Sequence, residues 1–149
     1  MPRIKLKELE RYGFSTTLTV RVSDLNYGAH LGYDRILTLA HHARLVLFED
    51  WGVTEMDLGD GSTGLVAGDA AVNYMGEGFL HDELVIEIQP IEIGSMGFRL
   101  AHRFSRNNDR ADVALAEVGF VGFDYESRRP HPLPIPFANK LKELQKEPI

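Results

Sequence analysis

Hydrophobic and polar positions alternate along most of this chain, and the alternation is interrupted once, near the N-terminus. In residues 14–22 every second position is Phe, Thr, Leu or Val, a period of two that is typical of a strand with one buried face. Later runs rich in Val, Ile and Phe predict four long strands. They are Gly64–Met75, Glu83–Ile93, Ser95–Ser105 and Ala111–Tyr125. Short turns at 92–95 and 107–110 predict antiparallel neighbours, and Asn and Asp in the second turn suit left-handed conformations.

The interruption has helical character. Residues 33–51 contain neither glycine nor proline and predict a helix of about five turns that ends at Gly52. Its apolar side chains cover more than one narrow stripe, which indicates a helix buried on most sides. Residues 137–146 predict a short amphipathic helix. We therefore predict an α+β fold in which one five-stranded antiparallel sheet wraps around the long helix. This arrangement would bury both the apolar surface of that helix and the apolar face of the sheet. The exposed sheet edges predict a homo-oligomer.

Composition narrows the function. The 149 residues, with 44% hydrophobic and 26% charged residues, predict one globular domain. The net charge of −6 and the scattered Lys and Arg argue against nucleic acid as a partner. Cysteine is absent, which excludes disulfides, thiolate metal ligands and a Cys nucleophile. No apolar run approaches the length of about 20 residues that spans a bilayer, and residues 1–10 are charged, so we expect no membrane partner and a cytoplasmic location.

The turn-rich segment before the long helix carries the densest set of reactive side chains. It reads Ser23-Asp24-Leu25-Asn26-Tyr27-Gly28-Ala29-His30-Leu31-Gly32-Tyr33-Asp34. With the order of the elements and the later runs 69–74, 82–84 and 123–125, this segment resembles the hot-dog superfamily, in particular thioesterases of the 4-hydroxybenzoyl-CoA thioesterase type. The similarity extends over residues 14–134. It implies a thioester hydrolase with no cofactor, whose small-molecule partner is an acyl thioester of coenzyme A and which forms a dimer or a dimer of dimers.

One position departs from this resemblance. Where family members have a carboxylate nucleophile or base after the first strand, this chain has Asn26. An amide neither accepts a proton at neutral pH nor acts as a useful nucleophile. The predicted base is therefore Asp34, expected in the first turn of the helix, with His30 assisting proton transfer and Asn26 orienting the water or the carbonyl. Asp24 is either a further carboxylate of the site or a cap of the loop.

Each of these three catalytic candidates also has a structural interpretation. Asp34 would complement the helix dipole, Asn26 would be a turn residue, and His30 would stabilise the loop through a hydrogen bond. The helix start itself suits a developing oxyanion, because its N–H groups are unpaired and carry partial positive charge. The resemblance implies that an N–H near Tyr33 holds the thioester carbonyl. The predicted substrate-binding residues are Tyr27, Gly28, Gly32, Tyr33 and His42.

Other patterns predict no further site. His41 and His42 are adjacent and point about 100° apart on a helix, so no metal site is predicted. Gly59–Gly64 has the letters of a dinucleotide-binding loop, but it follows a helix and opens a strand, so it predicts a plain loop. Glu77 and Asp82 predict a polar turn. Three arginines are either ligands of coenzyme A phosphates or solvated strand residues: Arg99, Arg103 and Arg106.

Two other functions fit the same fold. Asn26 in place of a carboxylate favours an acyl-CoA-binding protein without catalysis. A hot-dog hydratase or dehydratase pairs a His with an Asp, and His30 and Asp34 supply both. The acyl group stays open, because the orientation of the side chains that set pocket depth does not follow from the sequence.

Overall fold

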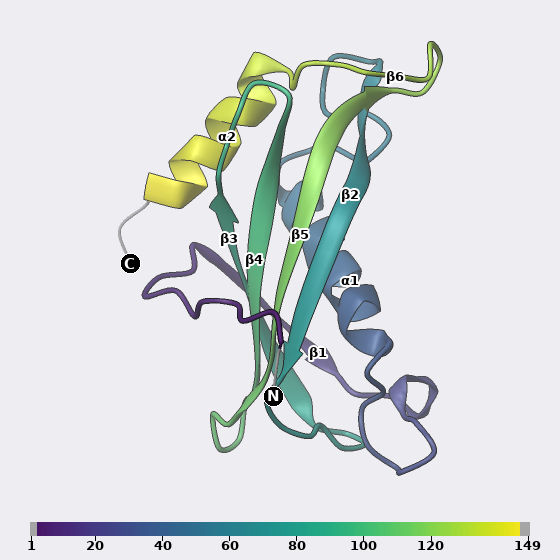
Figure 1. Cartoon of the computed structure of the whole chain (residues 1–149), viewed down its shortest axis with the longest axis vertical. Helices are drawn as coiled ribbons and strands as arrows, with labels where there is room; N and C mark the ends of the chain where they lie inside the picture. Colours follow the sequence, from purple (N-terminus) through teal and green to yellow (C-terminus); the bar gives the residue numbers. More distant parts are fainter. Residues whose placement is uncertain (1–2, 147–149) are drawn as a thin grey trace.

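One antiparallel sheet packs against a long helix (Figure 1). The computed structural model describes residues 3–146. The strands pair in the order β1-β3-β4-β5-β2, and a short strand, β6, pairs with β5. They are β1 (Phe14–Thr19), β2 (Thr63–Tyr74), β3 (Glu83–Ile91), β4 (Gly97–Arg106), β5 (Asp112–Asp124) and β6 (Arg129–Pro130). The α+β hot-dog arrangement of five long strands and a helix is confirmed, and β6 is an addition to it.

Helix α1 (Arg35–Asp50) begins later than the pattern predicted. The N–H of Arg35 donates to the carbonyl of Gly32 at 3.0 Å and closes a turn before the helix. Asp34 is therefore the N-cap residue and stands just outside the first turn in which it was expected. Its side chain makes no capping hydrogen bond.

One side of α1 packs against the sheet, and the other side is open. The side chains of Ile36, Ala40 and Leu47 are buried against the inner sheet face. On the opposite side Leu37 and Leu45 are 41% and 43% exposed. The expectation of a helix buried on most sides is thus wrong for one copy of the chain, because a single sheet covers only one side of a helix.

The second helix, α2 (Ile135–Lys146), closes the end of the core and confirms the expected amphipathic helix. It buries Phe137, Leu141 and Leu144. The Phe137 ring meets the Phe48 ring of α1 edge to face, with centroids 5.5 Å apart. Among the described residues, no helix combines the length and the apolar character that crossing a membrane requires.

The two tight turns confirm antiparallel hairpins, but the residues with positive φ differ from those expected. They are Glu92 (φ 47°) and Arg110 (φ 62°). Asp109 instead accepts a hydrogen bond from the N–H of Ala111 at 3.1 Å, and Asn108 accepts one from the N–H of Asp109 at 2.7 Å. The polar side chains therefore hold the turn, and the strain of the left-handed conformation falls on Arg110.

The outer face of the sheet is covered with ion pairs. Arg99 donates to Asp69 at 2.8 Å and to Glu117 at 2.6 Å. Arg103 likewise binds Glu87 at 2.8 Å and Glu8 at 2.9 Å. These contacts raise the pKa of both guanidinium groups. Arg106 pairs with Asp109 at 2.7 Å. All three arginines are engaged by carboxylates of the chain itself, which favours their structural interpretation over contacts with coenzyme A phosphates.

Candidate active site

The segment between β1 and α1 is a closed loop held at its base by Asp24. A 3₁₀ turn, η1 (Val22–Asp24), follows β1, and the Asp24 side chain is buried. Its Oδ2 accepts the N–H of Arg21 at 2.9 Å, and its carbonyl accepts the N–H of Gly32, also at 2.9 Å. Asp24 thus joins the two ends of the loop, which favours the capping role over that of a reactive carboxylate.

Asn26 organises the tip of this loop. Its Oδ1 accepts the N–H groups of Gly28 at 2.8 Å and His30 at 3.3 Å. Its own N–H donates to the carbonyl of His30 at 2.8 Å. The side-chain oxygen that was expected to orient a water is therefore already engaged, and the geometry favours the turn interpretation. Tyr27 lies at the tip, fully exposed to solvent.

His30 lies partly buried in the loop. Its Nδ1 is 3.3 Å from the carbonyl oxygen of Leu31 and 3.4 Å from Nδ2 of Asn26. Since a carbonyl can only accept, a proton on Nδ1 suits the first of these contacts and leaves Nε2 with its lone pair. In that tautomer His30 can accept a proton at Nε2, so the loop-stabilising and the proton-transfer interpretations are compatible.

A hollow of about 470 Å³ opens beside this loop. It is bounded by the loop, by the end of β2 and by the turn that follows β2. Three of the residues that the sequence singled out meet here, together with others from β2 and its turn. The lining residues are Asn26, His30, Leu31, Tyr33, Tyr74, Gly76 and Glu77.

The approach to α1 leaves two successive main-chain N–H groups unpaired in the described chain, and the first of them belongs to Tyr33, which lines this hollow. The N–H of Gly32 donates to the carbonyl of Asp24, and the N–H of Arg35 donates to the carbonyl of Gly32. Between them, the N–H groups of Tyr33 and Asp34 have no acceptor among residues 3–146. The Asp34 carboxylate is exposed and lies close to Gly32, since a Cβ added to Gly32 would be 2.8 Å from Oδ1 of Asp34. A carboxylate and two N–H donors are thus left available on the adjacent residues Tyr33 and Asp34, of which Tyr33 lines the hollow and Asp34 does not.

Two lining residues were not assigned to the site from the sequence. Glu77 was expected only in a polar turn, yet it lines the hollow. Tyr74, the last residue of β2, donates its hydroxyl to the carbonyl of Tyr33 at 2.9 Å. Burial raises the pKa of Tyr74, as do, to a smaller degree, the neighbouring Tyr33 and Asp34. No spacing rule connects Tyr74 with Tyr33, because residues so far apart in the chain meet only through the fold.

His42 does not join this group. It lines a separate hollow of about 260 Å³ between β1 and α1, together with Leu18, Thr19, Arg21, Thr38 and Leu39. The Nε2 atom of its neighbour His41 lies 3.1 Å from Oε2 of Glu55. The other carboxylate oxygen of Glu55, Oε1, accepts a hydrogen bond from Nε of Arg44 at 2.6 Å. The two adjacent histidines therefore have different surroundings.

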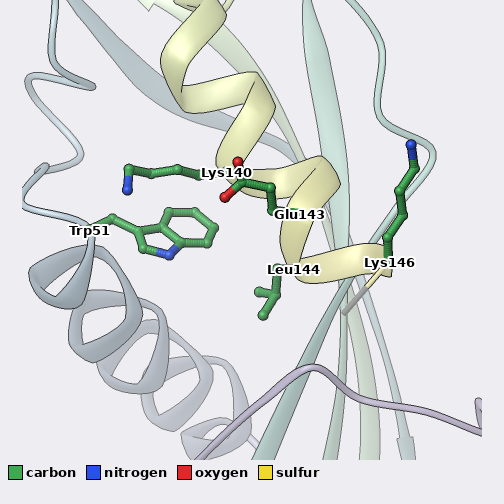
Figure 2. A pocket seen from close by; sticks show the side chains of 5 residues that line it. All are labelled: Trp51, Lys140, Glu143, Leu144 and Lys146. Carbon is green, nitrogen blue, oxygen red and sulfur yellow. The ribbon is translucent and has the colours of Figure 1, made fainter. Parts of the chain in front are cut away.

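Another hollow, of about 510 Å³, lies between the end of α1 and helix α2. Figure 2 shows the Trp51 ring facing Lys140 and Glu143, whereas Lys146 extends away from it. None of the residues that the sequence analysis selected for chemistry line it. The hollow beside the 24–34 loop is lined by a histidine, a carboxylate and a residue with an unpaired N–H, and it is therefore the candidate active site.

Comparison with known proteins agrees with the fold. The profile of a family described as the thioesterase-like superfamily matches residues 20–143. The resemblance to hot-dog thioesterases that the sequence suggested is thereby confirmed. No protein of curated function matches the sequence.

Solved structures resemble this one at low sequence identity. A 1,4-dihydroxy-2-naphthoyl-CoA thioesterase from Synechocystis is 17% identical with a TM-score of 0.80, over 88% of this chain and 96% of its own. A protein from Staphylococcus aureus, solved in complex with CoA, is 14% identical with a TM-score of 0.83, over 97% and 90%. A thioesterase-superfamily protein from Jannaschia sp. CCS1 is 17% identical with a TM-score of 0.80, over 92% and 86%. At such identities the likeness establishes the fold alone.

Proposed function

Since this chain belongs to the thioesterase-like superfamily, we propose that it hydrolyses an acyl thioester of coenzyme A in the hollow beside the 24–34 loop. One observation carries the proposal. The N–H groups of Tyr33 and Asp34 have no acceptor within residues 3–146, and Tyr33 lines the hollow. Fixed main-chain donors of this kind stabilise the oxyanion that forms during acyl transfer.

The available groups support a direct attack by water. Water adds to the carbonyl carbon while the Asp34 carboxylate takes up its proton, and the N–H groups of Tyr33 and Asp34 bind the oxyanion. The carbonyl then re-forms and the C–S bond breaks. The proton passes to the departing sulfur, with Nε2 of His30 as the relay, so that the free acid and the thiol leave.

Two carboxylates compete for the role of base. Asp34 adjoins the proposed oxyanion donors, and its side chain makes no capping hydrogen bond in the described chain. Glu77 follows β2 and lines the hollow. We assign the base to Asp34 because it adjoins the group that binds the carbonyl, and isosteric amides at both positions test this assignment.

Coenzyme A as the carrier is supported by two of the similar structures, whose substrate or bound molecule is a coenzyme A compound. The lining of the hollow is compatible with several acyl groups. Aromatic side chains from Tyr33 and Tyr74 contribute to it. Thiol release from aromatic and from aliphatic acyl-CoA compounds distinguishes between the two classes of acyl group.

We further propose that the chain acts as a homodimer. In the described part of the chain β2 pairs with β5 on one side and with no strand on the other. Leu37 and Leu45 of α1 are exposed as well. A second copy would cover this edge and this helix side, and we expect it to bring His42 of one chain into a shared substrate site. Sedimentation velocity on the purified protein measures the oligomeric state, and a monomer at micromolar concentration would contradict the proposal.

Release of free thiol from a panel of aromatic and aliphatic acyl-CoA compounds tests the reaction. We expect turnover well above the uncatalysed rate for at least one class of acyl group. Tight binding without thiol release would identify an acyl-CoA-binding protein instead. Loss of the conjugated absorbance of an enoyl-CoA without thiol release would identify a hydratase.

A further inference from the structure

We propose that Tyr74 is a positioning residue, whose hydroxyl holds the peptide group between Tyr33 and Asp34 so that its N–H is aimed at the thioester oxygen. This inference rests on the proposed thioesterase function. It adds a residue that the sequence pattern did not select and that supplies no charge or proton to the reaction.

The contact between Tyr74 and the helix approach has two parts. The Tyr74 hydroxyl donates to the carbonyl oxygen of Tyr33 at 2.9 Å. The two rings also meet edge to face, with centroids 6.4 Å apart and an interplanar angle of 78°. Both side chains belong to residues that line the hollow. The end of β2 is thus attached to the start of α1 at the candidate active site.

Tyr74 itself is held firmly by its neighbours in the chain. The amide of Asn73 binds the N-terminal segment, accepting from the N–H of Leu6 at 2.7 Å and donating to the carbonyl of Ile4 at 2.6 Å. On the other side the N–H of Met75 donates to the carbonyl of Val113 in β5 at 2.9 Å. The Tyr74 hydroxyl therefore acts from a fixed point on the sheet.

The chemistry of the peptide group explains why this contact affects a donor. The Tyr33 carbonyl and the Asp34 N–H belong to one planar unit, and in a trans peptide they point in opposite directions. A hydrogen bond to the carbonyl fixes the plane of the unit and polarises it, which strengthens the N–H as a donor. The preceding peptide unit consists of the Gly32 carbonyl and the Tyr33 N–H. It is held in the same way, because the N–H of Arg35 donates to the Gly32 carbonyl at 3.0 Å.

In both peptide units that supply the proposed oxyanion donors, the carbonyl oxygen therefore accepts a hydrogen bond. One is held by the main chain of the helix and the other by a side chain that comes from β2. Burial raises the pKa of Tyr74, so the phenol stays protonated and able to donate at neutral pH. The side chain can be altered without touching the donors themselves.

The test removes one oxygen atom. Tyr74→Phe is expected to lower kcat about tenfold while KM changes less than about twofold, because the lost hydrogen bond acts on the oxyanion more than on the bound substrate. Tyr125→Phe is the matched control, since Tyr125 also donates its hydroxyl to a β2 carbonyl, that of Leu65, away from the hollow. It should keep the wild-type kcat.

A second measurement reports on the donors directly and does not depend on turnover. The probe is a ketone analogue of an acyl-CoA that the enzyme cleaves, with a methylene group in place of sulfur and a ¹³C-labelled carbonyl. Its infrared carbonyl frequency should fall on binding to the wild-type protein and to Tyr125→Phe, and fall less on binding to Tyr74→Phe. The thermal midpoints of the three proteins show whether each variant is folded at the assay temperature.

The outcomes separate this inference from the function on which it rests. If the wild-type protein releases no thiol from any acyl-CoA, the proposed function fails. If the wild-type protein is active but Tyr74→Phe keeps both kcat and the carbonyl frequency, Tyr74 does not position the donor and the inference is overturned. An equal loss of kcat in both tyrosine variants, or a lower kcat with an unchanged frequency, would also overturn it.

Discussion

The hollow beside α1 and the outer face of the sheet differ in whether their polar groups have partners within the chain. On the outer face each of Arg99 and Arg103 binds two carboxylates. Next to the hollow, at the start of α1, the Asp34 carboxylate and the N–H of Tyr33 have no partner in the described part of the chain. Paired groups hold strands together, whereas unpaired groups beside a cavity remain available for a ligand. The comparison therefore predicts where a substitution affects activity and where it affects stability.

The largest effect is expected from the unpaired carboxylate. Asp34→Asn should lower kcat/KM at least about 100-fold, because the amide cannot accept the proton of the attacking water. The thermal midpoint should stay close to that of the wild type, since no hydrogen bond of the Asp34 side chain is lost. Glu77→Gln is the control, and a larger loss in this variant than in Asp34→Asn would transfer the role of base to Glu77.

The next largest effect is on the pH dependence of stability, and it arises from the inner sheet face. Burial lowers the pKa of His102 to about 4. In the unfolded chain His102 has the ordinary histidine pKa of about 6.5, so between the two pKa values it binds a proton that it does not bind in the folded chain. The free energy of unfolding should therefore decrease as the pH falls from about 6.5 to about 4, by up to about 3 kcal/mol.

Urea unfolding at a series of pH values checks this, with His102→Leu as the comparison. The variant should show a flatter curve between these pH values. An equally steep curve would mean that another group titrates. The measurement also sharpens the comparison, because it reports an effect on stability from a residue that does not line the hollow.

An intermediate effect is expected at Gly32. A methyl group there would lie 2.8 Å from Oδ1 of Asp34 and would push this flexible carboxylate aside. Gly32→Ala should lower kcat/KM about tenfold, because a misplaced base transfers protons poorly, with little change in the thermal midpoint. Gly68→Ala, where no atom lies within 4 Å of the added carbon, is the control. Full activity of Gly32→Ala would show that the position of Asp34 is not critical.

The smallest effect is expected on the outer face. Arg99→Met removes the contacts with Asp69 and Glu117 but keeps much of the apolar stem. The thermal midpoint should fall by about 3 °C, and kcat/KM should stay unchanged. Calorimetry and the thiol-release assay measure the two quantities. A loss of activity larger than the loss of stability would contradict the division between the two regions.

Much of the fold could be predicted from local patterns. The strands follow from alternation and β-branched residues, and the hairpin turns follow from their short connections. The start of α1 was misplaced, because Tyr33 and Asp34 are compatible with a helix and only the turn closed by Gly32 and Arg35 excludes them. The open side of α1 was also missed, since apolar positions such as Leu37 and Leu45 do not reveal which surface covers them.

The site was only partly predictable for the same reason. Asn26, His30 and Tyr33 are close in the chain, and they do meet in one hollow. Glu77 and Tyr74 reach that hollow through the pairing of β2 with β5, which no local pattern encodes. Whether a polar group is engaged or available, as with Asn26 and Asp34, depends on hydrogen bonds that exist only in the folded chain.

By itself, the sequence determined that this chain is an α+β hot-dog protein with its reactive residues gathered before one long helix, because periodicity and turn residues act over a few neighbouring positions. Tertiary structure alone decided which of those residues remain available for chemistry. It leaves Asp34 without a partner in the described chain and brings Tyr74 onto the carbonyl of Tyr33. The partner of Tyr74 lies far away in the chain and is chosen by packing, whereas Asn26 is engaged by residues two and four positions further on.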